Sequence, residues 1–452
     1  MKVLISGCGK IGTAIIESLI KENHQIAVID VDRQVVEKIT SRYDVLGFCG
    51  NGAQYDLLVE AGVNKTDLFI SVTGSDEFNM LSCFVAKKAG AKYTVARVRN
   101  SEYNNDSFEF VKSQLGLNMT INPELLTAQT LYNILELPSA TNIEPFSASE
   151  TEMIEVTVKE GSKMIGVPLF ELRKKYNYAF LVCIVERKGE VYIPNGNFVL
   201  EEGDNIGVFA SKSHTSKILQ SLGFENKPIK SVIIVGAGKT AYYLSRLLTQ
   251  SKTDVKVIEI DKEKCKEFSK SLDKVSVING DGMSQTLLLE EGISKTDGFV
   301  ALTGKDEQNV LMSVFSQSKD VKKTIAKINR DEILGISKSI GLETVISPKY
   351  LMADVIVSYA RALENSKESK IETLYSLLGG KAEACEFIVL EDFKHLNTPL
   401  KDLKLKKNVL IAGIIRDRKI IIPGGDDVIK VNDRVIVITS GLPLYDLSDL
   451  IN

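Results

Sequence analysis

Two glycine-rich segments hold the residues of this sequence whose spacing indicates a defined chemistry. Gly7-Cys8-Gly9-Lys10-Ile11-Gly12 follows the β-branched run from Val3 to Ser6 and precedes a helical pattern. Gly236-Ala237-Gly238-Lys239-Thr240-Ala241 stands in the same way after Val232 to Val235. Between a strand and a helix, such glycines let the backbone approach a pyrophosphate, whose charge then lies at the helix N-terminus. Each half is therefore predicted to bind an adenine dinucleotide or a related nucleotide.

A carboxylate ends the second predicted strand of each half, at Asp30 and at Glu259. In sheets of this kind an acid at this place accepts hydrogen bonds from the ribose hydroxyls, and it repels a 2′-phosphate. We therefore predict NAD(H) over NADP(H). For Asp32 and Asp261, two residues further on, an exposed acid at a helix start is the commoner explanation. The alternative for the whole pattern is a sheet of this fold that has lost its ligand.

Three more features of the chain are expected in the same crevice, because ligands of open parallel sheets bind at the carboxyl ends of the strands. Thr73-Gly74 and Thr303-Gly304 end the fourth predicted strand. Arg97 and Lys327 lie on the fifth and can pair with phosphates, although an arginine near a strand end is about as often solvated or salt-bridged. Gly50-Asn51-Gly52 follows the third strand and suits the adenosine edge.

The chain is two copies of one unit joined end to end. Gly7 corresponds to Gly236, an offset of 236 − 7 = 229 residues, and Gly50 corresponds to Gly280 with an offset of 230. The match continues through Lys65–Gly74 with Lys295–Gly304, Asp76-Glu77 and Asn79 with Asp306-Glu307 and Asn309, and Thr94–Arg97 with Thr324–Lys327. Shorter echoes, such as Gly203–Ile206 with Asn432–Val435, extend the repeat over the remainder of each half.

The predicted fold class is α/β, with two Rossmann-like doubly wound parallel sheets, each followed by a small α+β domain. In the first copy, strands are expected at 3–6, 25–29, 45–49, 68–72, 94–98 and 119–121, and helices at 11–20, 55–60, 77–87 and 124–135. The small domain is expected to have strands at 154–158, 179–185, 190–193 and 205–209 and a helix at 169–175. The domains are placed at 1–137, 143–224, 229–364 and 371–452, with linkers at 138–141, 223–228 and 364–370.

Asn122-Pro123 and Ser347-Pro348 each introduce an amphipathic helix, expected at 124–135 and 350–363. Proline near the first turn is a helix start signal. Each helix leaves a nucleotide-binding domain for a small domain, so we expect it to be a swapped or dimerising element.

The composition excludes several other classes of protein. The formal net charge is −3, without the basic excess of a nucleic-acid binder. The apolar runs last only a few residues where a membrane span needs about 20, and the first strand begins without a leader, so any membrane role is expected through a partner. Six scattered cysteines predict reduced thiols, and three distant histidines give no metal-binding pattern.

No catalytic set accompanies the predicted nucleotide sites. A dehydrogenase needs a proton donor and a substrate anchor, and the small domains offer no histidine–acid pair. Asp204 and Asp433 correspond in the two halves, but each lies in a turn that explains it without chemistry. We therefore predict that the protein is not an enzyme, and an NAD-dependent oxidoreductase is the alternative.

The duplicated chain resembles the TrkA family, the cytoplasmic nucleotide-binding subunits of bacterial and archaeal Trk-type potassium uptake systems. The paired glycine loops, the acids at 30 and 259, the Thr-Gly pairs at 73 and 303 and the repeated small domains carry the resemblance, which covers nearly the whole chain. It implies tandem RCK (or KTN) N- and C-domains. It also implies NAD(H) and ATP/ADP as ligands, a homo-oligomeric gating ring, and a separate potassium-translocating membrane subunit of the TrkH or TrkG type.

Carried over residue by residue, the resemblance implies two sets of nucleotide contacts. The first set is Gly7, Cys8, Gly9, Lys10, Ile11, Asp30, Thr73, Gly74 and Arg97, with Asn51 at the adenosine edge, and the second is Gly236, Ala237, Gly238, Lys239, Thr240, Glu259, Thr303 and Gly304. Lys327 stands where the first copy has Arg97, and it cannot make the bidentate phosphate contact of an arginine. Asp281 stands where the first copy has Asn51 and disfavours a triphosphate. The second site is therefore expected to be weaker or to prefer another nucleotide.

The expected mechanism is a shift between two shapes of the ring, because a ligand moves such an equilibrium only by binding one shape better. A nucleotide sensor for another transporter or for a potassium efflux channel is the remaining alternative.

Overall fold

The computed structural model describes residues 1–100, 103, 106–146, 150–175, 179–224, 227–342, 344–365, 371–417, 419–442, 444 and 446–451. The chain forms two compact units, and each unit combines two separate stretches of sequence. Met1–Gln129 and Ser231–Ala360 make the first unit, and Thr130–Lys230 and Arg361–Asn452 make the second. Each unit therefore takes one sheet from each half of the repeat.

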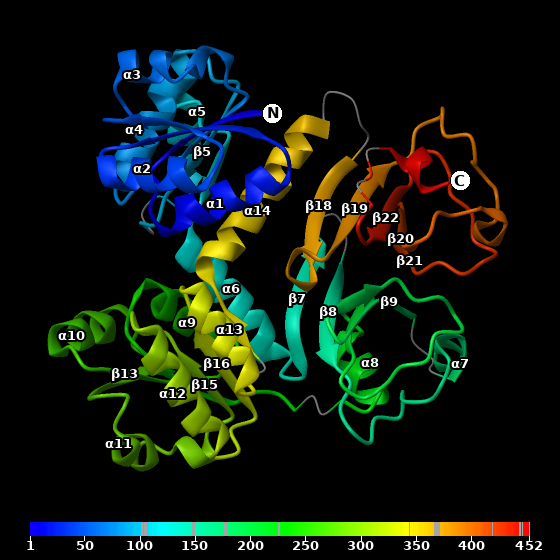
Figure 1. Cartoon of the computed structure of the whole chain (residues 1–452). Coiled ribbons are helices and arrows are strands. Elements are labelled where there is room, and N and C mark those ends of the chain that lie inside the picture. Colours follow the sequence, from blue (N-terminus) through cyan, green and yellow to red (C-terminus); the bar gives the residue numbers. More distant parts are fainter. Residues whose placement is uncertain are drawn as a thin grey trace. The chain divides into compact units, whose positions relative to one another are not determined.

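The first half contributes a six-stranded parallel sheet to unit 1 (blue to cyan in Figure 1), in the order β3-β2-β1-β4-β5-β6. Its strands are β1 Lys2–Ser6, β2 Gln25–Asp30, β3 Leu46–Cys49, β4 Leu68–Ser71, β5 Tyr93–Arg97 and β6 Met119–Ile121, and its helices are α1 Lys10–Lys21, α2 Arg33–Arg42, α3 Tyr55–Glu60, α4 Asp76–Lys88, α5 Asp106–Gln114 and α6 Pro123–Glu136. The central strands β1 and β4 are almost wholly buried, as apolar strands covered on both faces must be. This confirms the predicted Rossmann-type sheet.

The second half repeats this topology in the order β14-β13-β12-β15-β16-β17. Its strands are β12 Ser231–Val235, β13 Asp254–Glu259, β14 Val275–Asn279, β15 Gly298–Ala301, β16 Lys323–Lys327 and β17 Val345–Ile346, and its helices are α9 Lys239–Gln250, α10 Lys262–Ser271, α11 Gln285–Glu290, α12 Asp306–Gln317, α13 Asp331–Ser339 and α14 Pro348–Asn365. The switch in strand order between β12 and β15 lies beside the N-terminus of α9, as the switch between β1 and β4 lies beside that of α1. Both are the places where ligands of such sheets bind.

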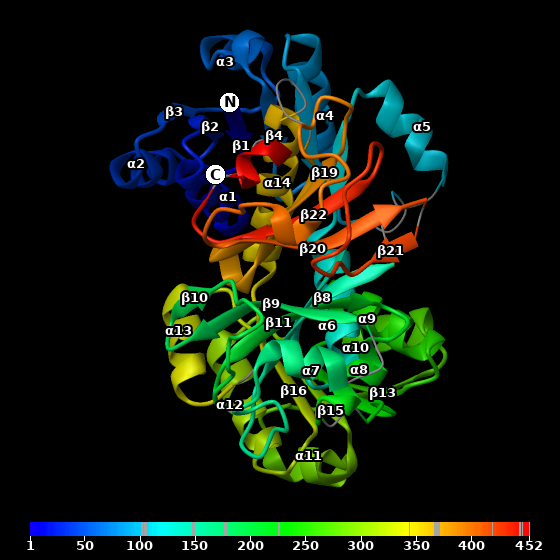
Figure 2. The same cartoon turned by 90° about the vertical axis from the view of Figure 1, so that its right-hand side faces the viewer.

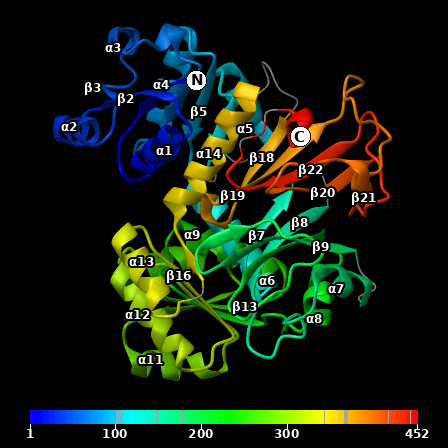
Figure 3. The same ribbon diagram turned by 45° about the vertical axis from the view of Figure 1, so that its right-hand side comes forward.

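The two long helices that leave the parallel sheets are exchanged between the halves within unit 1. Asn122, just before α6, donates from Nδ2 to the hydroxyl of Tyr243 on α9 at 3.2 Å. On the other side, burial and a hydrogen bond to Asp331 raise the pKa of Tyr350 on α14, and Glu17 of α1 adds to the rise. Figures 1 and 3 show α14 (yellow) lying beside α1 (blue). Each helix therefore begins against the glycine-loop helix of the other half.

Unit 2 contains two five-stranded antiparallel sheets, ordered β10-β9-β11-β8-β7 and β18-β19-β22-β20-β21 (cyan-green and orange-red in Figure 2). The first comprises β7 Ala140–Phe146, β8 Thr151–Thr157, β9 Phe180–Arg187, β10 Glu190–Tyr192 and β11 Asn205–Ser211, with α7 Leu169–Lys175 and α8 Thr215–Ser221. The second comprises β18 Ile371–Leu377, β19 Ala382–Ile388, β20 Val409–Arg416, β21 Lys419–Ile421 and β22 Arg434–Thr439. The two orders are the same when one is read backwards, so the repeat extends through the small domains.

The two antiparallel sheets share one core. Phe146 of β7 lies between Phe209 of the same sheet and Tyr375 of the other, with ring centroids 5.4 and 4.5 Å away. The carboxylate of Glu155 accepts a hydrogen bond from the Leu378 amide at 3.0 Å. The small domains of the two halves are thus packed on each other, which the repeat alone did not predict.

Asp204 and Asp433 do more than end a turn. Each is fully buried and accepts two hydrogen bonds from one guanidinium, Arg187 at 2.8 and 2.7 Å and Arg416 at 2.8 and 2.7 Å. The turn predicted from the sequence therefore explains these two aspartates only in part, because a buried carboxylate needs a partner of this kind. The role remains structural, since each buried charge is paired with one guanidinium.

The linker predicted at 138–141 is wrong at its second part, because Ala140 and Thr141 begin β7 and Ala140 is completely buried. The helices α2, α5 and α8 and the strand β7 were not predicted. Within the predicted linkers, Glu364 belongs to α14, and residues 225, 226 and 366–370 lie outside the described residues. None of the described helices is long and apolar enough to cross a membrane.

Candidate nucleotide site

The turn from β1 into α1 requires glycine at two positions. Gly7 has φ +97°, and a Cβ there would lie 3.0 Å from the amide nitrogen of Thr73. A Cβ on Gly12 would lie 2.0 Å from the carbonyl oxygen of Gly7. Gly9 is the N-cap and offers no side chain to the free amides of the first turn, where the amide of Thr13 is bonded to the Gly9 carbonyl. The start of α1 therefore presents unpaired N–H groups to an anion.

The acid of the first half is tied to this loop. Asp30 accepts the Cys8 amide on Oδ2 at 2.7 Å and the Asp32 amide on Oδ1 at 3.0 Å. A carboxylate has further lone pairs, and Asp30 also lines the cavity described below. Asp32 caps α2 by accepting the amide of Gln34, which is the commoner role expected for it.

The second half builds the same loop with one difference among its three glycine positions. Gly236 has φ +104°, and Gly238 is the N-cap of α9 without a side-chain cap. Glu259 accepts the amides of Ala237 on Oε2 at 2.8 Å and of Asp261 on Oε1 at 3.0 Å. The difference is Ala241 in place of the third glycine. Ala241 is completely buried. The helix α9 therefore accommodates a methyl group at the position where α1 has no room for one.

A cavity of about 800 Å³ lies in unit 1 and takes its lining from both halves. It carries six cationic side chains, Lys10, Arg97, Arg99, Lys239, Lys327 and Lys349, against the carboxylates of Asp30 and Glu124. The starts of four helices line it, with Gly9 before α1, Gly238 before α9, Pro123 in α6 and Pro348 in α14. Cationic side chains and helix N-termini attract the same kind of ligand, a multiply charged anion.

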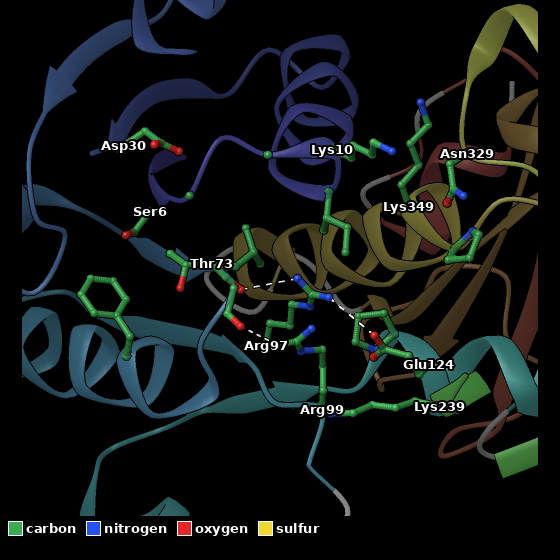
Figure 4. Close-up of a pocket in the computed structure, with 18 of the residues that line it drawn as sticks. Ser6, Lys10, Asp30, Thr73, Arg97, Arg99, Glu124, Lys239, Asn329 and Lys349 are labelled. Atoms are coloured by element: carbon green, nitrogen blue, oxygen red, sulfur yellow. Dashed lines mark hydrogen bonds and ion pairs between the residues drawn. The ribbon is translucent and has the colours of Figure 1, made fainter. Parts of the chain in front are cut away.

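The cavity is not symmetric between the halves. Of the residues predicted as site residues it is lined by Gly7, Gly9, Lys10, Ile11, Asp30, Thr73, Gly74, Arg97, Gly238, Lys239 and Thr240. It is not lined by Cys8, Asn51, Gly236, Ala237, Glu259, Thr303 or Gly304. In the first half it reaches from Asp30 to the glycine loop, and in the second half it reaches the glycine loop, Lys327 and the start of α14 but not Glu259. In Figure 4 Asp30 lies at one end, far from Asn329 and Lys349 at the other.

Two of the predicted site residues that do not line the cavity have other structural roles. The Cys8 side chain is buried, and burial together with the nearby Asp30 carboxylate raises the pKa of its thiol to about 12. Asn51 closes a turn by accepting the Ala53 amide at 2.8 Å, and Asp281 accepts the Met283 amide in the same way. The exchange of Asn51 for Asp281 therefore keeps the turn and changes its charge.

Arg97 lies in the middle of the cavity wall (Figure 4). Its Nη1 donates to the Thr73 carbonyl at 3.4 Å, and its Nη2 faces Glu124 Oε1 at 3.6 Å. Its Nε and the second oxygen of Glu124 are buried without a hydrogen-bond partner among the described residues. Burial lowers the pKa of Arg97 and also that of Lys327, whose Nζ donates to the Leu302 carbonyl at 2.9 Å. Both cations line the cavity.

The residues that hold the Thr-Gly turns were not among the predicted site residues. Asn79 is fully buried and accepts the Thr73 amide at 2.8 Å and its hydroxyl at 2.7 Å, while its Nδ2 donates to the Arg97 carbonyl at 2.9 Å. Asn309 makes the same bonds to Thr303 and to Lys327. The signal was present, because Asn79 and Asn309 stand at corresponding positions of the repeat.

Asp76 and Asp306, at the starts of α4 and α12, were also missed. Asp76 accepts the amides of Arg99 and Asn100, each at 2.8 Å, and so positions the Arg99 side chain at the cavity. Two further missed lining residues, Glu124 and Lys349, come from the exchanged helices, whose packing the sequence does not reveal. Among the described residues, no three histidine, cysteine, aspartate or glutamate side chains gather as a metal site.

Comparison with known proteins supports the repeat and the fold. The family model of the TrkA-N domain matches residues 3–123 and 232–348, and that of the TrkA-C domain matches residues 153–223 and 386–451. Among solved structures, a GsuK RCK domain has a TM-score of 0.65 at 17% identity, over 97% of this chain and 92% of that chain. A GsuK channel bound to NAD has the same score and identity, over 97% and 77%. At this identity the likeness concerns the fold alone.

Relatives of similar length are found in archaea and bacteria. A Trk system potassium uptake protein TrkA homolog of Archaeoglobus fulgidus is 33% identical over 97% of both chains. A TrkA homolog of Methanosarcina mazei is 31% identical over 97% of both, and TrkA of Vibrio alginolyticus is 28% identical over 97% of this chain and 95% of its own. With both family models matched twice and such relatives aligned almost end to end, this chain belongs to the TrkA family.

Proposed function

We propose that this protein is a nucleotide-binding regulatory subunit of a potassium uptake system. It acts in the cytoplasm, as a homo-oligomeric ring beneath a separate potassium-translocating membrane subunit of the TrkH or TrkG type. The observation that carries the proposal is the cavity of unit 1, where a glycine loop, the carboxylate of Asp30 and six cations meet. The relatives named as Trk potassium uptake proteins support the transport role.

The ligand in this proposal is NAD(H), with ATP or ADP as the other candidates. The nucleoside lies beside Asp30 and Val31, and the phosphates lie at the N-terminus of α1. Support comes from the anion-attracting lining and, by analogy of fold, from GsuK structures described as bound to NAD and to ADP. The proposal retains the four domains at 1–137, 143–224, 229–364 and 371–452, and a second, weaker site at Glu259.

A regulatory role fits this lining better than catalysis does. The described residues that line the cavity include no histidine, the side chain that most often transfers a proton in catalysis. An oxidoreductase would need such a donor next to the cofactor. We therefore propose binding without turnover.

The acids of the two halves are expected to contribute unequally to nucleotide affinity. Asp30→Ala removes a charged acceptor that lines the cavity, and a hydrogen bond to a charged group is worth about 1.5 to 3 kcal/mol. NADH or ATP should therefore bind about 10- to 100-fold more weakly by isothermal titration. Glu259→Ala is the matched control, because Glu259 holds the equivalent loop amide but does not line the cavity. A threefold loss or less is expected from it, and equal losses would refute the asymmetric site.

The regulatory role itself predicts that nucleotide affinity depends on the membrane partner. Coupling between two binding events is reciprocal, and typical values correspond to a 5- to 150-fold change in affinity. We expect nucleotide titrations of the protein alone and of its complex with the detergent-solubilised membrane subunit to differ by about fivefold or more. Equal affinities in the two titrations would contradict regulation by nucleotide while leaving nucleotide binding itself intact.

A further inference from the structure

A buried tyrosine of the second half is bonded to the first half beside the nucleotide site. Tyr243 lies on α9, one turn after Lys239, and its side chain is 6% exposed. Its hydroxyl donates to the main-chain carbonyl of Arg99 at 3.3 Å and accepts from Asn122 Nδ2 at 3.2 Å. Asn122 also donates to the Arg99 carbonyl at 3.2 Å and accepts the Leu125 amide at 2.9 Å. One hydroxyl thus joins α9 to a strand end and to the start of α6.

The residue that receives this bond belongs to the wall of the cavity. Arg99 donates from its guanidinium to the Gly74 carbonyl and to Asp76, and its own amide is held by the same Asp76 carboxylate at 2.8 Å. The Thr-Gly turn of the first half and the hydroxyl of Tyr243 are therefore connected through a single residue, Arg99, whose side chain lines the cavity.

The second half has no such connection in the opposite direction. By the repeat offset, Tyr243 corresponds to Ala14 on α1, which has no hydroxyl. Asn122 corresponds to Ser347, the residue before the proline of α14, and the Ser347 hydroxyl is buried without a hydrogen-bond partner among the described residues. The bonded network is thus found on one side of a pair of otherwise repeated structures.

We propose that the Tyr243 hydroxyl couples the glycine loop of the second half to the nucleotide site of the first, by fixing where α9 presents Lys239 to the cavity. A helix moves as a rigid rod over one turn, about 5.4 Å, so a displacement of α9 that withdraws Lys239 also separates the hydroxyl from the Arg99 carbonyl. Tyr243 is then a positioning residue, because it does not itself line the cavity. The proposal rests on nucleotide binding in this cavity.

A double-mutant cycle tests this coupling. We would titrate ATP and NADH into the full-length protein and into Lys239→Ala, in the wild-type background and in Tyr243→Phe. The loss of one cavity cation should weaken binding about tenfold in the wild-type background, the scale of one charge-assisted contact. In Tyr243→Phe the same substitution should weaken binding threefold or less, because Lys239 is no longer held in place.

Tyr242→Phe is the matched control. It removes a hydroxyl from the neighbouring residue of the same helix, one with no hydrogen bond among the described residues, while its ring contacts Phe268 and the Tyr243 ring. In this background Lys239→Ala should keep its full tenfold effect. Asn122→Ser is a second route, since serine still caps α6 but is too short to reach Tyr243. It removes one of the two bonds of the hydroxyl and leaves the bond to the Arg99 carbonyl, so the Lys239→Ala effect should lie between those in Tyr243→Phe and in the wild type.

The outcomes separate the possible failures. A wild-type protein that binds neither nucleotide overturns the proposed function and this inference with it. Nucleotide binding with the same Lys239→Ala effect in all backgrounds overturns the coupling alone. Nucleotide binding without any Lys239→Ala effect in the wild-type background also overturns it, because the second loop then contributes nothing to the site. Thermal unfolding of each variant without ligand checks that the fold is retained.

Discussion

Replacement of Gly9 by aspartate is expected to abolish nucleotide binding in the first half without unfolding the protein. Gly9 is the N-cap of α1, with an extended backbone at φ −65° and ψ −167°, and a Cβ there meets no atom within 4 Å. Aspartate is among the best N-cap residues, so the helix should gain a few tenths of a kcal/mol. The same carboxylate would bond the free amides of the first turn and repel a phosphate from them.

The measurement combines a nucleotide titration with an unfolding curve. We expect affinity to fall by about 100-fold or more, the scale on which a preorganised charged contact is lost and replaced by repulsion, while the unfolding temperature stays the same or rises. Gly9→Ala is the steric control and should keep affinity within a few fold, because the methyl group has room. If Gly9→Asp binds nucleotide as the wild type does, the phosphates do not lie at the start of α1.

Gly238→Asp places the same carboxylate at the N-cap of α9, where a Cβ also has open space. Because the cavity reaches this loop but not Glu259, the variant should weaken binding less than Gly9→Asp does. Equal losses would indicate that the two halves contribute alike.

Replacement of Gly12 by alanine is expected to be the most destabilising single-methyl change in unit 1. The new Cβ would lie 2.0 Å from the Gly7 carbonyl oxygen, so α1 must move away from β1. Overpacking of a buried contact costs about 1 to 3 kcal/mol and occasionally more, and a clash with rigid backbone belongs at the upper end. We expect a loss of about 3 kcal/mol in the free energy of unfolding of unit 1. Denaturant titration measures this loss.

The matched control is Ala241→Gly at the corresponding position of α9. It removes a methyl group that the second half accommodates, and it should cost about 1 kcal/mol through helix propensity alone. Since a chain with two compact units need not unfold in one step, the transition that shifts in each variant identifies the unit concerned. Equal losses of unfolding free energy for Gly12→Ala and Ala241→Gly would mean that α1 moves away from the Gly7 carbonyl at little cost, which would contradict the predicted clash.

The regular parts of the fold could be predicted because local pattern and burial agree there. β-Branched runs such as Val232 to Val235 became central strands, and Pro123 and Pro348 marked the starts of α6 and α14. β7 was missed because Ala140 and Thr141 follow a proline and look like a linker, although tertiary packing buries Ala140. The polar helix α2 was missed because it has few apolar residues, of which it buries only Val36 and Ile39.

The candidate site could be predicted only where a motif is contiguous in sequence. Gly7, Gly9, Asp30 and Arg97 stand at fixed offsets from predicted strands, and these four line the cavity. Glu124, Lys239 and Lys349 reach the same cavity because the long helices exchange between the halves, and this depends on packing between residues more than a hundred positions apart. Asn79 stands at a repeated position of the sequence, but its role as a buried bridge is seen only from its five side-chain hydrogen bonds.

Both parallel sheets belong to one compact unit of one polypeptide. Dilution therefore cannot separate the two glycine loops, which always meet at the high effective concentration of tethered partners. An assembly made of separate identical subunits must carry every substitution on both sides of its interface. In this single chain the two sides can differ. Tyr243 corresponds in the repeat to Ala14, and Lys327 corresponds to Arg97. The two sides of this interface can therefore have different functions, as in a heterodimer, within the product of one gene and at any protein concentration.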